Sequence, residues 1–158
     1  MKKKVFLTAS WKKLIMANYA VDRSLLQPFV PAGTILDSWN DTCYVSLVGF
    51  LFADVRVKGF AVPFHRSFPE INLRFYVKRK EGDEWKRGVV FIKEIVPKPA
   101  ITWVANFIYK ENYATMRATH FLEISGGELK TGYSWKKKGK WNRLMVTALP
   151  DPIPLQPG

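Results

Sequence analysis

The stretch from Phe68 to Val77, FPEINLRFYV, constrains the fold more than any other part of the chain. Apolar and polar side chains alternate along it. One side carries Ile71, Leu73, Phe75 and Val77, and the other carries Glu70, Asn72, Arg74 and Tyr76. Because neighbouring residues of a strand point to opposite faces, this alternation predicts a strand with one face in a hydrophobic core. The polar side faces either open water or a pocket in which an acid, an amide and a guanidinium lie together.

Further strands are expected on both sides of this one. The runs 42–57, 85–96, 120–125, 128–135 and 140–149 are rich in β-branched and aromatic residues and are punctuated by turn residues. Asn40 and Asp41 are expected to form a hairpin turn. Residues 9–19 fit either a strand or a helix.

Two helices are also expected. Asp22 can cap a short helix that ends near Phe29, and Pro99 suits the first turn of a longer one. The longer helix would bury a stripe made of Ile101, Val104, Ala105 and Ile108. The chain is therefore predicted to be mainly β, of the α+β class. We expect an antiparallel curved sheet or a cone-like β-barrel, with one or two helices against one face.

The length of 158 residues fits one domain, which we place at residues 1–149. Residues 150–158 read PDPIPLQPG. Proline lacks a backbone donor, so this segment cannot lie inside a sheet. It is predicted to be a proline-rich tail, either a linker or the point at which a longer chain has been cut.

The net charge of +12 raises nucleic acid or an anionic membrane as a partner. However, the basic runs 2–4, 78–80 and 136–140 lie in a terminal segment or beside Gly-containing turns. This placement favours solvated loop tips. The interleaved Trp and Tyr residues keep an alternative function open, a non-enzymatic nucleic-acid binder or a homo-oligomeric scaffold.

The compartment is predicted from features that the chain lacks. Cys43 is the only cysteine, so no internal disulfide can form, as in reducing compartments. No segment contains the roughly 18 consecutive apolar residues of a transmembrane helix. The N-terminus has basic residues but not the apolar region of a signal peptide. We therefore expect a cytoplasmic protein with no membrane partner.

Metal and cofactor sites are not predicted. His65 and His120 lie far apart and have no third ligand at a useful spacing. A Gly-rich phosphate loop, a Walker pattern and a Gly-x-Ser-x-Gly elbow are all missing. Cys43 lies among large apolar residues and is interpreted as a buried small hydrophobe.

Lys93 and Glu94 are candidate site residues because they interrupt an apolar strand. As neighbours they would point to opposite faces. The expected companions are Val89, Phe91 and Ile95 for Lys93, and Val90, Ile92 and Val96 for Glu94. A desolvated ammonium has a lowered pKa, which makes the neutral amine available as a Schiff-base nucleophile. Alternatively, Lys93 reaches water or pairs with a carboxylate. Lys98, held between two prolines, is a second candidate.

The polar side of the opening strand supplies the other candidates. Arg74 offers a planar fork for a carboxylate ligand. Glu70 could transfer protons if burial raised its pKa. Asn72 and Tyr76 share the same face and would help to bind a ligand. The alternative is a wet outer face.

Several segments resemble one family when they are taken in order. They are WKKLIMANYAVDRSLLQPFVPAGTILDSWNDTCYVSLVGF, FPEINLRFYV, RGVVFIKEIVPKPAI and YKENYATM. The chain resembles the bacterial-type, YqjF-like family of unknown function, DUF2071, over most of its length. That family looks related to the acetoacetate decarboxylase superfamily. The resemblance implies a β-rich, cone-like barrel with flanking helices and a central cavity.

The resemblance also implies a chemistry. True acetoacetate decarboxylases use a lysine that forms a Schiff base with a β-keto acid. Glu94 and Lys98 echo the segment that carries this lysine, but the spacing is shorter and Pro99 replaces a second lysine. Glu70 is similar to the acid of the cavity. The expected function is an internal pocket for a small organic or keto acid, with decarboxylase-like lyase chemistry through Lys93 or Lys98 as an option.

Overall fold

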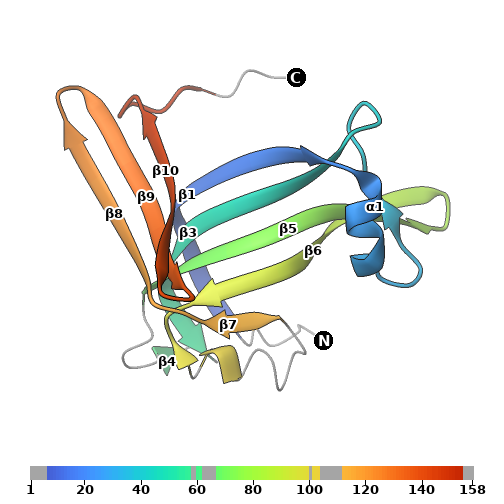
Figure 1. Ribbon diagram of the computed structural model, residues 1–158, viewed down its shortest axis with the longest axis horizontal. Coiled ribbons are helices and arrows are strands. Elements are labelled where there is room, and N and C mark those ends of the chain that lie inside the picture. Colours follow the sequence, from blue (N-terminus) through green and yellow to red (C-terminus); the bar gives the residue numbers. More distant parts are fainter. Residues whose placement is uncertain (1–6, 58–59, 62–66, 100, 104–111, 155–158) are drawn as a thin grey trace.

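The computed structural model describes residues 7–57, 60–61, 67–99, 101–103 and 112–154 (Figure 1). Strands dominate these residues and form two sheets. The mainly β class predicted from the sequence is confirmed. Because no ladder joins the two sheets in the described part of the chain, they do not close into a barrel. The cone-like barrel expected from the sequence is therefore wrong for this structure.

The first sheet has seven strands and holds most of the molecule. Its main path runs β1 (Leu7–Val21), β3 (Cys43–Val57), β5 (Phe68–Glu81), β6 (Glu84–Val96) and β7 (Tyr113–Thr115). Two short strands lie off this path. β2 (Ile35–Leu36) pairs with β5, and β4 (Phe60–Ala61) pairs with β3. All pairs are antiparallel except β6 with β7, which is parallel.

The second sheet is a three-stranded meander of β8 (Ala118–Ser125), β9 (Glu128–Lys137) and β10 (Lys140–Ala148). It stands at an angle to the first sheet, at the opposite end from α1 (Arg23–Leu26) in Figure 1. Asp22 caps α1 by accepting a 2.7 Å hydrogen bond from the Ser24 amide, and a 3-10 turn, η1 (Gln27–Phe29), follows. The predicted cap and the end of this helix are confirmed.

One face of the first sheet, here called the packed face, carries two of the three hydrophobic clusters that the described residues form, while Phe68 and Val96 of the third lie on the other face. The packed face is the side of β5 that presents Ile71 and Phe75. Near α1, Phe75 is packed with four other buried residues, which are Leu26, Leu36, Cys43 and Val77. The Cys43 thiol is free and buried among them, as predicted. At the other end, Ile71 joins Ile15, Ile95 and Tyr133, so the second sheet covers this part of the packed face.

Tyr133 joins the two sheets. Its ring lies over Gly49 of β3, so closely that a Cβ at Gly49 would overlap it. Its hydroxyl donates a 2.7 Å hydrogen bond to the backbone carbonyl of Lys13. Lys13 sits in an irregularity of β1 with φ of 54°, where the register with β3 shifts between Lys12 and Ile15. The bulge thus presents a carbonyl to the second sheet.

Most elements predicted from the sequence are found. The ambiguous residues 9–19 belong to strand β1. Asn40 and Asp41 have φ of 46° and 58° and form a tight turn closed by the Trp39–Thr42 bridge, since this turn type needs positive φ at both positions. The helix expected from Pro99 is described only as far as Trp103, so the rest of its predicted apolar stripe lies outside the described residues.

Candidate polar site on the first sheet

The other face of the first sheet, here called the polar face, carries the residues Glu70, Asn72, Arg74 and Tyr76 of β5. It does not open to water at its centre. Only 2% of Glu70 and 2% of Asn72 is exposed, and Glu94 of β6, which is the register partner of Asn72, is 3% exposed. Residues that are directly opposite in a sheet share a face, so these three side chains lie together.

A hydrogen-bond network connects this buried group. The Asn72 amide donates to Glu70 Oε1 at 3.2 Å. The Tyr113 hydroxyl, from β7, donates to Glu70 Oε2 at 3.1 Å. Tyr113 is also the register partner of Glu94. Two carboxyl groups, an amide and a phenol therefore lie close together on the polar face. Buried polar groups of this kind are usually hydrogen-bonded to one another.

Tyr113 remains a proton donor in this network. Burial raises the pKa of its hydroxyl far above the usual value, and the neighbouring charges of Glu70 and Glu94 raise it further. The phenol is thus held in its neutral form at physiological pH. Tyr113 is not among the site residues predicted from the sequence, although it lies in the segment YKENYATM.

Arg74 lies next along β5 and is partly buried. Its Nη2 contacts the sulfur of Met16 at 3.7 Å, and its Nε is buried with no hydrogen-bond partner among the described residues. Within the described residues no carboxylate forms an ion pair with Arg74. The polar face therefore presents a guanidinium with its charge available to an anion.

Tyr76 ends this row and is bound to the neighbouring strands. Ser46 of β3 donates a 2.6 Å hydrogen bond to Asn18 Oδ1, and the Ser46 and Tyr76 hydroxyls are 2.6 Å apart. Since Ser46 gives its single proton to Asn18, the Tyr76 hydroxyl donates to Ser46, and the Met16 sulfur, 3.9 Å from that hydroxyl, is the weaker acceptor. This chain orients the Asn18 amide on β1.

Lys93 and Glu94 point to opposite faces, as predicted, but their companions differ from the prediction. A register shift between Leu73 and Arg74 leaves Ile92 as an extra residue of β6. Such a bulge exchanges the two faces on one side of it. Phe91 and Val89 therefore lie with Glu94 on the polar face, as the register partners of Arg74 and Tyr76. Val90 and Ile92 pack against the core on the other face.

The two candidate lysines are placed differently. Lys93 is on the packed face, opposite Leu73, and its ammonium donates a 3.0 Å hydrogen bond to Asn112 Oδ1. It therefore does not share a face with Glu70 and Asn72. Lys98 follows β6, and its backbone carbonyl accepts hydrogen bonds from Ile101 and Thr102 at the start of the next helix. Its catalytic role stays a prediction.

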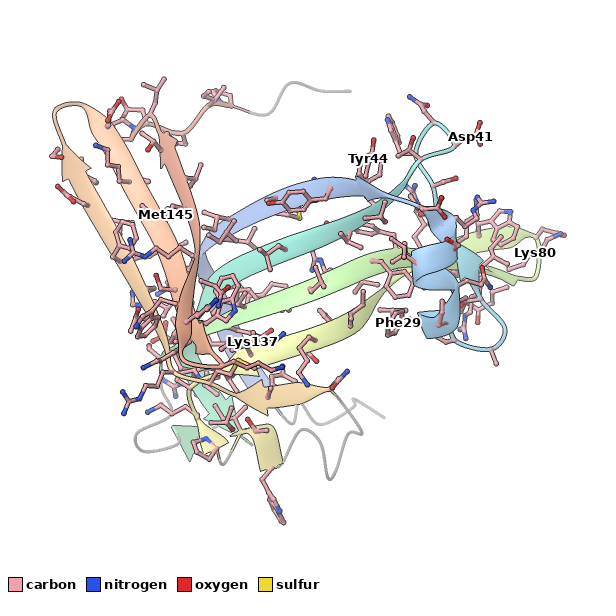
Figure 2. The ribbon with its side chains drawn as sticks, viewed as in Figure 1. Phe29, Asp41, Tyr44, Lys80, Lys137 and Met145 are labelled. Atoms are coloured by element: carbon pink, nitrogen blue, oxygen red, sulfur yellow. The ribbon has the colours of Figure 1, made fainter. Side chains whose placement is uncertain are left out.

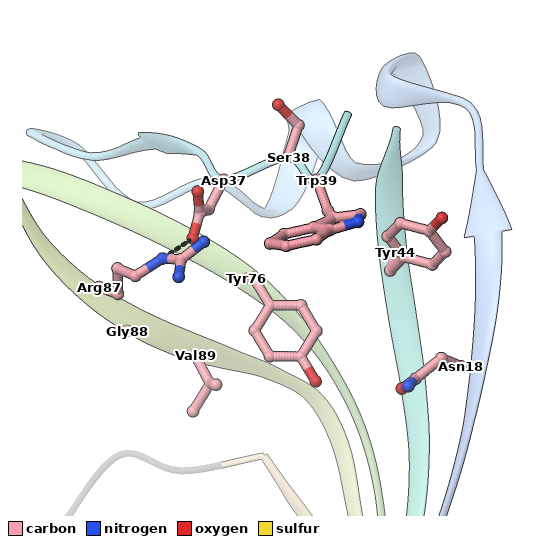
Figure 3. A pocket seen from close by; sticks show the side chains of 9 residues that line it. All are labelled: Asn18, Asp37, Ser38, Trp39, Tyr44, Tyr76, Arg87, Gly88 and Val89. Atoms are coloured by element: carbon pink, nitrogen blue, oxygen red, sulfur yellow. Dashed lines mark hydrogen bonds and ion pairs between the residues drawn. The ribbon is translucent and has the colours of Figure 1, made fainter. Parts of the chain in front are cut away.

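A pocket of about 540 Å³ opens further along the polar face, where β5 and β6 approach the 37–39 loop (Figure 3). Its lining consists of Asn18, Asp37, Ser38, Trp39, Tyr44, Tyr76, Arg87, Gly88 and Val89. Tyr76 is the one predicted site residue among them. The loop is attached to β5 by a 3.0 Å hydrogen bond from the Asp37 amide to the Tyr76 carbonyl.

No metal centre is found in the described part of the chain, because no group of three His, Cys, Asp or Glu side chains lies together there. His65 lies outside the described residues. His120 stacks against Tyr133 with ring centroids 6.2 Å apart, and burial and the charge of Lys13 lower its pKa. Among the described residues, no helix is long and apolar enough to cross a membrane.

The basic turns do not converge. Lys80, close to the end of β5, and Lys137, beside the β9–β10 turn, lie far apart in Figure 2. A nucleic-acid groove would need these charges on one surface. The arrangement therefore does not favour the alternative function considered from the sequence.

Solved structures with a similar fold include acetoacetate decarboxylase-like proteins. The acetoacetate decarboxylase of Legionella pneumophila matches with a TM-score of 0.68 and 14% identity, covering 96% of this chain and 52% of that one. The enduracididine biosynthesis enzyme MppR, complexed with the condensation product of pyruvate and imidazole 4-carboxaldehyde, matches with a TM-score of 0.64 and 13% identity, covering 97% and 58%. Identities this low show a common fold and nothing more.

The chain belongs to the DUF2071 family, described as an uncharacterized conserved protein, whose family model matches residues 8–157. The uncharacterized protein YqjF of Bacillus subtilis is 36% identical over 83 residues, which is 52% of this chain and 33% of YqjF. The chain thus spans about half the length of the solved relatives, and the match to YqjF spans a third of that protein. The predicted division into a domain at 1–149 and a tail at 150–158 stays a prediction.

Proposed function

We propose that this chain is a cytoplasmic protein that binds a small organic acid, such as a keto acid, on the polar face. Arg74 would take the carboxylate, and Glu70 and Asn72 would orient the rest of the ligand. The observation that carries this proposal is the guanidinium of Arg74, which has no acidic partner among the described residues.

A partly buried charge without a counter-ion is energetically costly. Removing a cation from water is unfavourable unless an anion or several hydrogen-bond acceptors replace the water. The Met16 sulfur is a weak acceptor, so it compensates little of that cost. A carboxylate ligand would supply two strong acceptors in the geometry that a guanidinium matches.

The buried acids suit a ligand with a second polar group. Asn72 already donates to Glu70, and its Oδ1 is buried with no hydrogen-bond partner in the part of the chain that the structure describes. A ligand hydroxyl or enol beside it would find an acceptor. Glu70 and Tyr113 are in turn connected by the 3.1 Å hydrogen bond, which gives the site a phenolic proton donor and a carboxyl group close together.

Arg74 is the variant that tests binding. Pyruvate and acetoacetate would be titrated by ligand-observed NMR into the wild type and into Arg74→Met, which keeps much of the length but removes the charge. We expect Arg74→Met to weaken binding about tenfold or more, as for the loss of a charge-assisted hydrogen bond. The control is Arg79→Met, because Arg79 is exposed and pairs with Glu81. Equal affinities in all three proteins would contradict the proposal.

Lyase chemistry is a separate part of the proposal. In that version a lysine amine condenses with the ketone of the ligand and releases water. Lys98 is the better candidate, because Lys93 lies on the packed face. Borohydride added to the protein with acetoacetate would reduce the imine and increase the mass of the chain. The adduct should persist in Lys93→Gln and disappear in Lys98→Gln. If the wild type gains no mass, the Schiff-base chemistry is excluded and acid binding is still tested by Arg74.

A further inference from the structure

We propose that the pocket beside the 37–39 loop is a second ligand site, which binds a planar aromatic acid. It is separate from the carboxylate site at Arg74 and does not depend on it. Neither Arg74 nor Met16 is part of the pocket lining, which comes from β1, the 37–39 loop, β3, β5 and β6.

The walls of the pocket suit a flat ring. Trp39, Tyr44 and Tyr76 contribute aromatic side chains from a loop and two strands (Figure 3). Trp39 is 66% exposed, so much of its indole surface is available to a ligand. The volume of about 540 Å³ falls within the usual range of small-molecule sites. Aromatic rings favour offset or edge-to-face packing, which a planar ligand can adopt here.

The charge at one end of the pocket favours an anion. Asp37 accepts a 2.7 Å hydrogen bond from Arg87 Nε, and Lys78 lies 3.8 Å from its other oxygen. Two cations thus surround one carboxylate. The hydrogen bond to Asp37 and its charge raise the pKa of the Arg87 guanidinium, which stays charged. Its two terminal nitrogens form no hydrogen bond within the described residues, so they can donate to a ligand carboxylate.

A cationic ligand is disfavoured by the same arrangement. Aromatic side chains around a carboxylate can bind an ammonium group, because the ring faces are negative. Here, however, the carboxylate of Asp37 is already compensated by Arg87 and Lys78. A further cation would be repelled by both. The anionic ligand is therefore the better fit.

The other end of the pocket carries a neutral donor. Asn18 Oδ1 accepts the hydrogen bond from Ser46 and is therefore turned toward β3. The Asn18 Nδ2 hydrogens can then donate to a ligand in the pocket. In Figure 3, Asn18 and Arg87 lie on opposite sides of the aromatic residues. A ligand that meets both ends has a carboxylate at one end of its ring and a hydroxyl or carbonyl acceptor at the other.

The proposal is tested with 4-hydroxybenzoate as the probe, titrated by ligand-observed NMR. Trp39→Leu should weaken binding about tenfold, the typical effect of removing an aromatic stacking partner. The matched control is Trp141→Leu, because Trp141 is a similarly exposed tryptophan, at 50%, in the second sheet. It should bind the probe as the wild type does. Arg87→Lys, which keeps the charge beside Asp37 but removes the fork, should also weaken binding.

Further outcomes separate the two sites. Cyclohexanecarboxylate, an acid without a planar ring, should bind much more weakly than the aromatic probe. Arg74→Met should leave the affinity for 4-hydroxybenzoate unchanged even where it abolishes pyruvate binding. The inference is overturned if Trp39→Leu binds the probe like Trp141→Leu, or if Arg74→Met alone removes binding. In the latter case the aromatic acid would belong to the Arg74 site.

Discussion

Both faces of β5 are buried at its centre, but only the polar face buries carboxyl groups there. On the packed face, Phe75 is fully buried among aliphatic side chains of α1, β2 and β3. On the polar face, Glu70 and Asn72 are also buried. Their neighbours include the apolar Val48 and Phe50 of β3, but also Tyr113 and Glu94. Low exposure alone therefore does not identify a core. Hydrocarbon burial stabilises the fold, whereas buried ionisable groups rarely add stability and are more often retained for another reason.

Of the substitutions that compare the two faces, Phe75→Ala is expected to lower the free energy of unfolding most. The change removes a ring from a cluster that cannot fully collapse, so the free energy of unfolding should fall by about 3–5 kcal/mol. Urea denaturation followed by circular dichroism measures it. A loss below about 1 kcal/mol would mean that the packed face is not the principal core.

Gly49→Ala should come next, because the new methyl group would meet the Tyr133 ring. Overpacking of this kind costs about 1–3 kcal/mol. The double variant Gly49→Ala with Tyr133→Leu sharpens the comparison, since a smaller side chain gives the methyl room. A double-mutant cycle by thermal denaturation should show that the two changes are strongly non-additive. Additive losses would indicate that the sheets do not meet at this point.

Tyr133→Phe should cost about 1 kcal/mol, because it removes the hydrogen bond to the Lys13 carbonyl. Burial raises the pKa of Tyr133 from 10.0 to about 12. The folded form thus resists ionisation that the unfolded chain undergoes, so stability from this group is complete below pH 10 and is lost as the pH rises towards 12. Between pH 9 and 12, the free energy of unfolding should fall less steeply with pH in Tyr133→Phe than in the wild type. If the free energy of unfolding falls equally steeply in both proteins, ionisation of Tyr133 does not contribute to the loss of stability at alkaline pH.

The smallest change in stability is expected from Glu70→Gln on the polar face. The amide keeps the shape of the side chain, and the Tyr113 hydroxyl can accept as well as donate a hydrogen bond. The free energy of unfolding should change by about 1 kcal/mol or less. Binding of a keto acid should nevertheless weaken. A loss comparable with that of Phe75→Ala would show that the two faces carry equal weight in folding.

Much of the fold follows from patterns within single segments. The alternation in FPEINLRFYV placed Phe75 and Glu70 on opposite faces, and the Asn40–Asp41 pair marked a hairpin turn. These features depend on side-chain period and on the residues that tolerate positive φ. By contrast, barrel closure depends on which distant strands pair, and no local pattern determines that.

The candidate site was predictable only where it depends on the pattern within one strand. The polar residues of β5 could be grouped from their spacing, but the extra residue at Ile92 moved Phe91 to the face of Glu94, and a bulge has no strong signature in its sequence. Tyr113 and Trp39 were missed because they reach the polar face only after β7 and the 37–39 loop are placed beside β5 and β6.

The bulge at Lys13 has a consequence beyond the contact with Tyr133. In the described part of the chain β1 lies at one edge of its sheet, so one row of its amides and carbonyls faces outward. A straight row of this kind invites another polypeptide to add a strand and so begin a fibril. The left-handed backbone at Lys13 interrupts the row midway, and an incoming segment could align with only one half of β1 at a time.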